Sequence, residues 1–204
     1  ESSKIYMVGN ILMDTLRFNH QRFARPAVMD NLGLTEKRYI VFTLNRKAII
    51  GNDDELRALL VSMMSHTGDI PVVAPLRQLA ADAVQRIVNE NPLLFENLHI
   101  VEPLDYLHFG YLTSNALGVV TDSGNVAEEA TFNTVPCITL NSYTEHIETV
   151  KVGSNVLVGE DPVLLGEEMA RMVDGKWKHC GIPERWDGRS AERIVQTLLE
   201  CAAK

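Results

Sequence analysis

A short polar stretch between two regular segments carries the most suggestive chemistry in the sequence. Residues 121–130 read TDSGNVAEEA, in which a strand pattern ends, a small polar turn follows and a helix pattern begins. The backbone N–H groups of Ser123, Gly124 and Asn125 could bind a phosphate, because the N-terminus of a helix favours an anion. An ordinary capped helix explains the same residues equally well, since Asn125 and Glu128 have the spacing of a capping box. Both interpretations stay open from the residues alone.

Two adjacent glutamates in this helix are expected to have different roles. Glu128 and Glu129 project roughly 100° apart around a helix axis, so one can close the cap while the other reaches outward. A carboxylate repels a phosphate. We therefore expect Glu129 to face outward and to suit neutral hydroxyl groups, such as those of a ribose.

Other loops offer less specific candidates. Arg46, in the basic turn 45–47, and Arg77 could contact an anion, although an exposed basic loop is the commoner explanation. His146 offers a titratable imidazole after a strand. Aromatic residues that could stack on a planar base are Tyr106, His108 and Phe109, although an aromatic on a helix is more often part of the core. The sequence contains no Gly-x-Gly-x-x-Gly, Walker A, His-Glu-x-x-His or Gly-x-Ser-x-Gly motif.

The elements that must position these loops alternate regularly along the chain. Predicted strands are Tyr39–Leu44, Ile70–Ala74, Leu98–Val101, Leu117–Thr121, Cys137–Leu140 and Asn155–Val158. Predicted helices are Leu12–Ala24, Asp53–Ser65, Leu76–Asn89, Tyr106–Asn115, Asn125–Phe132, Glu145–Val150, Asp161–Val173 and Ser190–Ala203, with a loop over Gly175–Asp187. Apolar strands separated by helices indicate an α/β fold with a doubly wound, Rossmann-like parallel sheet. Ligands bind at the carboxyl ends of the strands in such a sheet, which is where the candidate loops lie.

Helix patterns also make local predictions. Asp161 should cap the helix that follows it, with Pro162 in the first turn. Leu79 should face inward from its helix. The last helix should turn its apolar residues inward, namely Ile194, Val195, Leu198 and Leu199.

Composition limits the class of protein. The chain has 204 residues, of which 46% are hydrophobic and 23% charged, enough for one large domain with a sizeable core. Its net charge of −8 disfavours nucleic acid as a partner. No apolar run approaches the ~20 residues of a membrane span, which predicts a soluble, cytoplasmic protein. Three scattered cysteines and six histidines without helical ligand spacing predict neither a disulfide framework, a metal site nor a cofactor.

Both ends of the chain suggest a larger protein. The chain begins at Glu1 rather than at a methionine, and Ile5–Leu16 reads as the continuation of an upstream segment. The terminal helices 12–24 and 190–203 would suit packing against a missing N-terminal domain, although ordinary terminal helices explain them equally well.

Several segments together resemble the non-hydrolysing UDP-N-acetylglucosamine 2-epimerases. Residues 102–109 and 121–130 are similar to the family's E-P-L-x-Y-x-x-F and T-D-S-G-G-x-x-E-E-A. Residues 8–14 are similar to its interdomain G-N-x-x-x-D, and residues 144–159 to its T-E-R-P-E-T…G…L-V-G. Residues 187–194 are similar to its D-G-x-A-x-x-R-I. The order and spacing of these segments are specific, and they cover nearly the whole chain.

The resemblance implies the C-terminal half of a two-domain, glycosyltransferase-B-like fold, with residues 1–204 as a single nucleotide-sugar-binding domain. Such isomerases invert C2 of UDP-N-acetylglucosamine to give UDP-N-acetylmannosamine, by eliminating and re-adding UDP, and are associated with cell-envelope polysaccharide. Their main acid/base carboxylates lie in the first half, so this half alone is expected to be inactive. The implied partners are a UDP-sugar and the missing N-terminal domain. A homodimer of the intact protein is also compatible with the resemblance.

Site residues follow from the resemblance position by position. Ser123 and Gly124 match the family's phosphate contacts. Glu129 matches its ribose-binding carboxylate, Phe109 the residue near uracil, and Arg46 the basic residue after the catalytic histidine.

Four positions depart from the family pattern. Asn45 replaces the functional histidine, and Ala74 replaces the histidine of V-H-P. Asn125 replaces the second glycine of D-S-G-G, and His146 replaces the arginine of T-E-R-P. Three interpretations therefore remain: an epimerase with altered site chemistry, acting on UDP-N-acetylglucosamine or on another UDP-N-acetyl sugar, a degenerate nucleotide-sugar-binding homologue, or a transferase of the same architecture. The Asp-Ser-Gly…Glu-Glu match favours the epimerase over the transferase.

Overall fold

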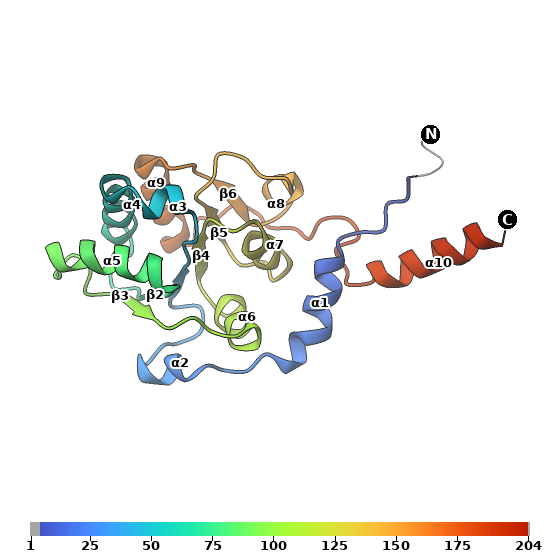
Figure 1. Ribbon diagram of the computed structural model, residues 1–204, viewed down its shortest axis with the longest axis horizontal. Helices are drawn as coiled ribbons and strands as arrows, with labels where there is room; N and C mark the ends of the chain where they lie inside the picture. The colour runs from blue at the N-terminus through green and yellow to red at the C-terminus, as the bar shows by residue number, and fades with distance from the viewer. Residues whose placement is uncertain (1–4, 204) are drawn as a thin grey trace.

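A six-stranded parallel sheet forms the centre of the molecule (Figure 1). The computed structural model describes residues 5–203, so Glu1 and Lys204, the two ends of the expected domain, lie outside the described residues. The strands are β1 Ile40–Phe42, β2 Val72–Pro75, β3 Leu98–Val101, β4 Gly118–Thr121, β5 Cys137–Thr139 and β6 Asn155–Leu157. Their order is β3-β2-β1-β4-β5-β6, and all neighbouring pairs are parallel. The predicted doubly wound α/β fold is confirmed, and the strand order reverses between β1 and β4.

Helices cover both faces of this sheet. The helices of the described residues are α1 Ile11–Asn19, the 3-10 helix η2 His20–Arg22, α2 Ala27–Asn31, α3 Lys47–Ile50, α4 Asp53–Ser65, α5 Gln78–Glu90, α6 Tyr106–Ser114, α7 Gly124–Phe132, α8 Ile147–Lys151, α9 Pro162–Val173 and α10 Ser190–Ala202. The short α2 and α3 escaped prediction, because four or five residues are too few for a periodic pattern. The predicted cap of α9 is confirmed, since the Asp161 carboxylate accepts from Val163 N and Leu164 N. None of the helices described between residues 5 and 203 is long and apolar enough to cross a membrane.

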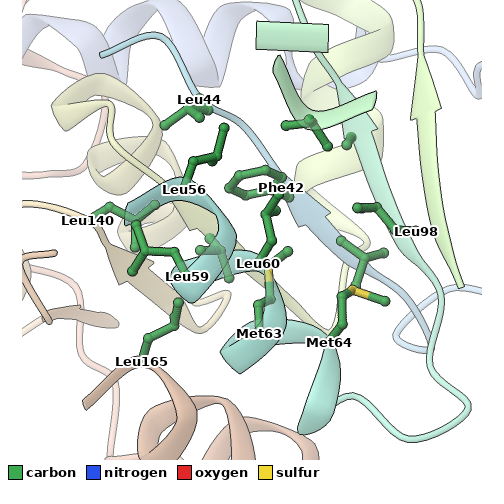
Figure 2. Close-up of a cluster of buried hydrophobic side chains, with 14 of the residues drawn as sticks. Phe42, Leu44, Leu56, Leu59, Leu60, Met63, Met64, Leu98, Leu140 and Leu165 are labelled. Atoms are coloured by element: carbon green, nitrogen blue, oxygen red, sulfur yellow. The ribbon is translucent and has the colours of Figure 1, made fainter. Parts of the chain in front are cut away.

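Successive side chains of a strand point to opposite faces of the sheet, which divides the core into two layers. Ile40 and Phe42 point into the layer beneath α4, α5 and α9, whereas Tyr39 and Val41 point into the layer beneath α2, α6 and α7. Figure 2 shows part of the first layer, where α4 packs its leucines and methionines against Phe42 and Leu140. Burial on both faces explains why the strands are nearly continuous apolar runs.

Two predicted helix faces are wrong. Leu79 lies in the first turn of α5 and is 68% exposed. The apolar face of α10 is also exposed, because this helix extends away from the sheet as an arm (Figure 1). Its residues Ile194, Val195, Leu198 and Leu199 are 37%, 56%, 64% and 67% exposed. Amphipathic spacing shows which side chains need cover, but not whether the same chain provides it.

The base of the α10 arm is nevertheless fixed to α1. The Asp14 carboxylate accepts from the backbone N–H groups of Ser190 and Ala191, both at 2.9 Å. This contact satisfies free donors at the helix start and places a negative charge there. Arg193 donates to the carbonyl of Val8 at 3.2 Å, so the incoming segment 5–10 runs beside the arm.

The buried face of α4 makes a testable contribution to stability. Leu60 is 1% exposed, so Leu60→Ala should lower the free energy of unfolding by about 2–5 kcal/mol, through lost burial and a residual cavity. Leu93 is 83% exposed, and Leu93→Ala should change it by less than about 0.5 kcal/mol. Urea unfolding of the two variants measures the difference. Equal losses would contradict the assigned core.

Candidate functional site

Three loops meet at the carboxyl edge of the sheet through Asp122. This residue follows β4, and its carboxylate accepts from the backbone N–H groups of Asn45, at 2.8 Å, and of Arg46 in the loop after β1. Asn141, in the loop after β5, donates from its side-chain amide to the Asp122 carbonyl at 3.0 Å. These contacts bring together the ends of β1, β4 and β5, next to the point where the strand order reverses.

The loop after β4 leads into α7 without a side-chain cap. Ser123 is the N-cap residue, its backbone is extended, and its N–H donates to Thr121 Oγ1 at 3.0 Å. No side chain caps the helix, which begins at Gly124. Of the two interpretations left open by the sequence, the capping box of Asn125 and Glu128 is therefore wrong. Because the first N–H groups of a helix have no partner within it, this end can receive an anion.

A polar pocket of about 240 Å³ lies beside this helix start. It brings together the predicted residues Gly124, Asn125 and His146. The other lining residues are Ala127, Thr139, Asn141, Tyr143, Thr144, Glu145 and Asn155. Sequence analysis missed Thr139 and Asn141, whose signal was a polar residue at or just after the end of a strand.

Gly124 has no structural need for a glycine. A Cβ built on this residue would meet no atom within 4 Å, and its φ lies outside the left-handed region. A glycine that neither packing nor backbone conformation requires indicates the close approach of something else. Gly124 also lines the polar pocket.

Glu129 is buried rather than outward-facing, which corrects the expectation for this residue. Its exposed fraction is 8%, and α7 packs against α1. Burial raises the pKa of the Glu129 carboxyl to about 7, with a smaller contribution from the charge of Glu128. Tyr106 lies close enough that the charge of Glu129 adds to the effect of burial, which raises the Tyr106 pKa to about 12.

Glu128 joins α7 to two other segments. It is 3% exposed, and its Oε1 accepts from the side-chain amide of Asn10 and lies 3.4 Å from His146 Nδ1. Burial raises the pKa of Glu128, whereas the Asn10 hydrogen bond and the charge of His146 oppose this rise. This carboxylate therefore has a cross-linking role where the sequence predicted a cap. Sequence analysis missed Asn10 as a site residue, although it lies in segment 8–14, which was singled out for its resemblance to a family motif.

The remaining predicted residues lie around the polar pocket rather than in it. The Arg46 guanidinium pairs with Glu160 at 2.6 Å and donates to Asn141 Oδ1 at 3.1 Å, so it already braces the loops after β5 and β6. Asn45 is exposed and lines a neighbouring pocket of about 440 Å³ that also includes Arg77. Phe109 is half-buried on α6 and packs against the second core layer.

The raised pKa of Glu129 predicts how stability depends on pH. Folding shifts this carboxyl from its ordinary value of 4.5 to about 7, so the folded state binds more protons than the unfolded state between these values. The stability of the wild-type chain should therefore fall as the pH rises from about 4.5 through 7. Glu129→Gln removes this pH dependence. Over that pH interval, the free energy of unfolding of the variant should therefore rise by about 3 kcal/mol relative to that of the wild type. Urea unfolding of the wild type and of Glu129→Gln at pH 5 and pH 8 tests this prediction. If their free energies of unfolding differ by the same amount at both pH values, the burial of the Glu129 charge is contradicted.

Comparison with known proteins identifies relatives of the chain. Residues 1–199 match the sequence model of the family described as UDP-N-acetylglucosamine 2-epimerase. The UDP-N-acetylglucosamine 2-epimerase of Methanocaldococcus jannaschii is 32% identical over 97% of the chain and 55% of its own length. A Pseudomonas aeruginosa UDP-2,3-diacetamido-2,3-dideoxy-D-glucuronate 2-epimerase is 33% identical over 98% of the chain and 54% of its own length. The chain thus spans about half the length of these relatives.

Solved structures agree with the sequence relatives. The M. jannaschii enzyme superimposes with a TM-score of 0.82 at 29% identity, over 98% of the chain and 57% of that protein. A second structure of that enzyme, in complex with UDP-GlcNAc and UDP, gives a TM-score of 0.75 at 29% identity, over 97% of the chain and 56% of that protein. A glycosyltransferase with a TM-score of 0.52 at 17% identity, over 85% of the chain and 40% of that protein, shows the glycosyltransferase-B-like fold alone. The chain belongs to the UDP-N-acetylglucosamine 2-epimerase family and corresponds to the C-terminal half of its members.

Proposed function

We propose that the chain is the UDP-binding half of an isomerase that inverts C2 of a UDP-N-acetylhexosamine by eliminating and re-adding UDP. The observation that carries the proposal is the uncapped start of α7, with open space beside Gly124 and a polar pocket at its edge. The N–H groups of this turn suit the diphosphate, which remains charged throughout elimination and re-addition. Ser123, Gly124 and Asn125 are its proposed contacts.

Glu129 is the proposed ribose ligand. A buried carboxylate costs free energy unless it is protonated or accepts hydrogen bonds, and ribose hydroxyl groups are suitable donors. Ribose binding would stabilise the charged form of Glu129 and lower its raised pKa. Phe109, Arg46 and His146 are the proposed contacts to uracil and to the sugar-diphosphate. For Arg46, such a contact requires its pair with Glu160 to rearrange or be shared.

A further domain is proposed to cover the terminal segments. Residues 5–7 and the α10 arm expose apolar side chains side by side, with Tyr6 hydrogen-bonded to Cys201 at 3.4 Å. A face of this kind favours burial against a partner. The half of the relatives that lies beyond the chain is the proposed partner, which α10 and α1 would contact, and it would supply the main acid/base carboxylates.

The sugar, the cellular setting and the assembly are also proposals. UDP-N-acetylglucosamine is the first candidate, and a diacetamido-glucuronate derivative is the second because a relative of nearly equal identity carries that name. Matches to epimerases favour isomerisation over glycosyl transfer or binding alone. Three free cysteines suit the reducing cytoplasm, where the product would feed cell-envelope polysaccharide. We also propose a homodimer of the intact protein, which analytical ultracentrifugation would test.

Substitution at Gly124 tests the phosphate site. An alanine methyl group meets no protein atom, and alanine suits a helix better than glycine, so Gly124→Ala should leave thermal stability unchanged or slightly higher. The same methyl group should obstruct the diphosphate and weaken UDP binding by roughly tenfold or more. Calorimetry should also rank wild-type affinity as UDP, then UMP, then uridine. Unchanged UDP affinity in the variant, or equal affinity for UDP and uridine, would contradict the site.

The residue at position 45 is expected to limit the rate of the intact protein. Asparagine can donate a hydrogen bond but cannot carry a charge or exchange a proton near neutral pH, and loss of one such group commonly costs ~10²–10⁴ in rate. Deuterium uptake at C2 of UDP-N-acetylglucosamine, followed by NMR, should be slow in the wild type. It should rise in Asn45→His combined with His146→Arg. Wild-type turnover as fast as that of ordinary family members would contradict this expectation.

A further inference from the structure

His146 lies between two pockets. It lines the polar pocket beside the start of α7, together with Gly124 and Asn125. It also lines a pocket of about 640 Å³ that includes Gly9 and Asn10 of the incoming segment and Trp186 of the loop before the α10 arm. Its imidazole is therefore placed to respond to an anion on one side and to contact the terminal segments on the other.

A direct chain of contacts runs from His146 to the incoming segment. His146 Nδ1 lies 3.4 Å from Glu128 Oε1, and the same oxygen accepts from the side-chain amide of Asn10. Asn10 in turn caps α1, because its Oδ1 accepts from Leu12 N at 2.9 Å. Glu128 lies one turn after the N–H groups of the proposed phosphate site, on the same helix. Movement or a change of charge at either end must therefore be accommodated by the buried Glu128 carboxylate.

In the described part of the chain, the charged residues that contact His146, or that line a pocket with it, are all glutamates. Glu128 faces it from α7, and Glu148 faces it from α8 with an oxygen 3.9 Å from Nδ1. Glu145 precedes it in the chain, and Glu184 lines the larger pocket from the loop before α10. A diphosphate in the polar pocket would add more negative charge on the remaining side. Histidine is the side chain that converts such a change into proton uptake near neutral pH.

We propose that His146, Glu128 and Asn10 form a relay that couples diphosphate binding at the start of α7 to the terminal segments, with His146 taking up a proton from solvent when the diphosphate binds. The relay rests on the proposed function. Protonated His146 attracts both the diphosphate and the Glu128 carboxylate. Diphosphate binding therefore strengthens the contact between His146 and Glu128, which holds the carboxylate that accepts from Asn10. Glu128 and Asn10 are positioning residues, since they act through His146 and through the helix α7.

Proton-linked calorimetry tests the first half of the relay. UDP is titrated into the chain at pH 6 to 9, in buffers of different ionisation enthalpy, and the number of protons bound per UDP is obtained at each pH. His146→Arg is the matched control, because arginine keeps the positive charge but does not titrate in this range. At the pH where proton uptake per UDP is greatest, the wild type should take up roughly half a proton more than this variant. As the pH falls from 9 to 6, the affinity of the wild type for UDP should rise roughly tenfold more than the affinity of the variant does.

Tryptophan fluorescence tests the second half. The chain contains two tryptophans, so Trp177→Phe leaves Trp186, which is 4% exposed and lines the larger pocket with His146 and Asn10. Saturating UDP should change its emission in this background. Asn10→Ser keeps a capping oxygen but is too short to reach Glu128, and Glu128→Gln removes the charge that His146 contacts. Both variants should lose most of the fluorescence change at saturating UDP.

Each result decides between the relay and the site on which it rests. UDP binding with equal proton uptake in the wild type and His146→Arg would overturn the relay alone, as would an unchanged Trp186 response in Asn10→Ser and Glu128→Gln. The absence of any UDP binding would overturn the proposed function and the relay together. Proton uptake with UDP but not with uridine would support both.

Discussion

The Asp122 carboxylate holds the loops after β1 and β4 together where the strand order reverses, and the arrangement of the site depends on this contact. One oxygen accepts two backbone N–H groups, from Asn45 and Arg46, so the loop after β1 is fixed through its main chain. The other oxygen is buried without a protein partner. A carboxylate is suited to this role because charge-assisted hydrogen bonds to backbone donors are strong. With this edge fixed, the start of α7 and the polar pocket lie beside the crevice of the parallel sheet.

Two buried carboxylates on α7 distinguish this helix from one that serves stability alone. Glu128 has partners on two other segments, whereas Glu129 is held at a raised pKa by burial. Burying charge costs free energy, and natural proteins commonly accept that cost where a ligand or a moving part compensates for it. Here Glu129 lies on the helix that begins at the proposed nucleotide site, and Glu128 contacts His146 of the polar pocket and Asn10 of the incoming segment. One short helix would thus combine the proposed ligand binding with attachment to the terminal segments.

Periodicity predicted the sheet and most long helices, because strands buried on both faces and amphipathic helices leave repeating patterns in sequence. It failed where the described chain leaves an apolar helix face exposed, as for Leu198 and Leu199 on α10. Local spacing also suggested a capping box at Glu128, but a tertiary contact with Asn10, distant in sequence, determines its role. Gly124 and Asn125 were predicted as site residues because a small polar turn follows a strand there, and His146 because a titratable imidazole follows a strand. Asn141 was not, since one amide after a strand has no distinctive pattern.

The central claim is that UDP binds at the start of α7, and an NMR titration of the 15N-labelled chain tests it most directly. The backbone amides of Gly124 and Asn125 should show the largest shifts with UDP and much smaller shifts with uridine, because hydrogen bonds to phosphate oxygens deshield these protons. Residues around Lys47 and Arg77, in the neighbouring pocket, serve as the internal comparison. Largest shifts at Gly124 and Asn125 would agree with the account. Largest shifts around Lys47 and Arg77, with Gly124 unchanged, would contradict it.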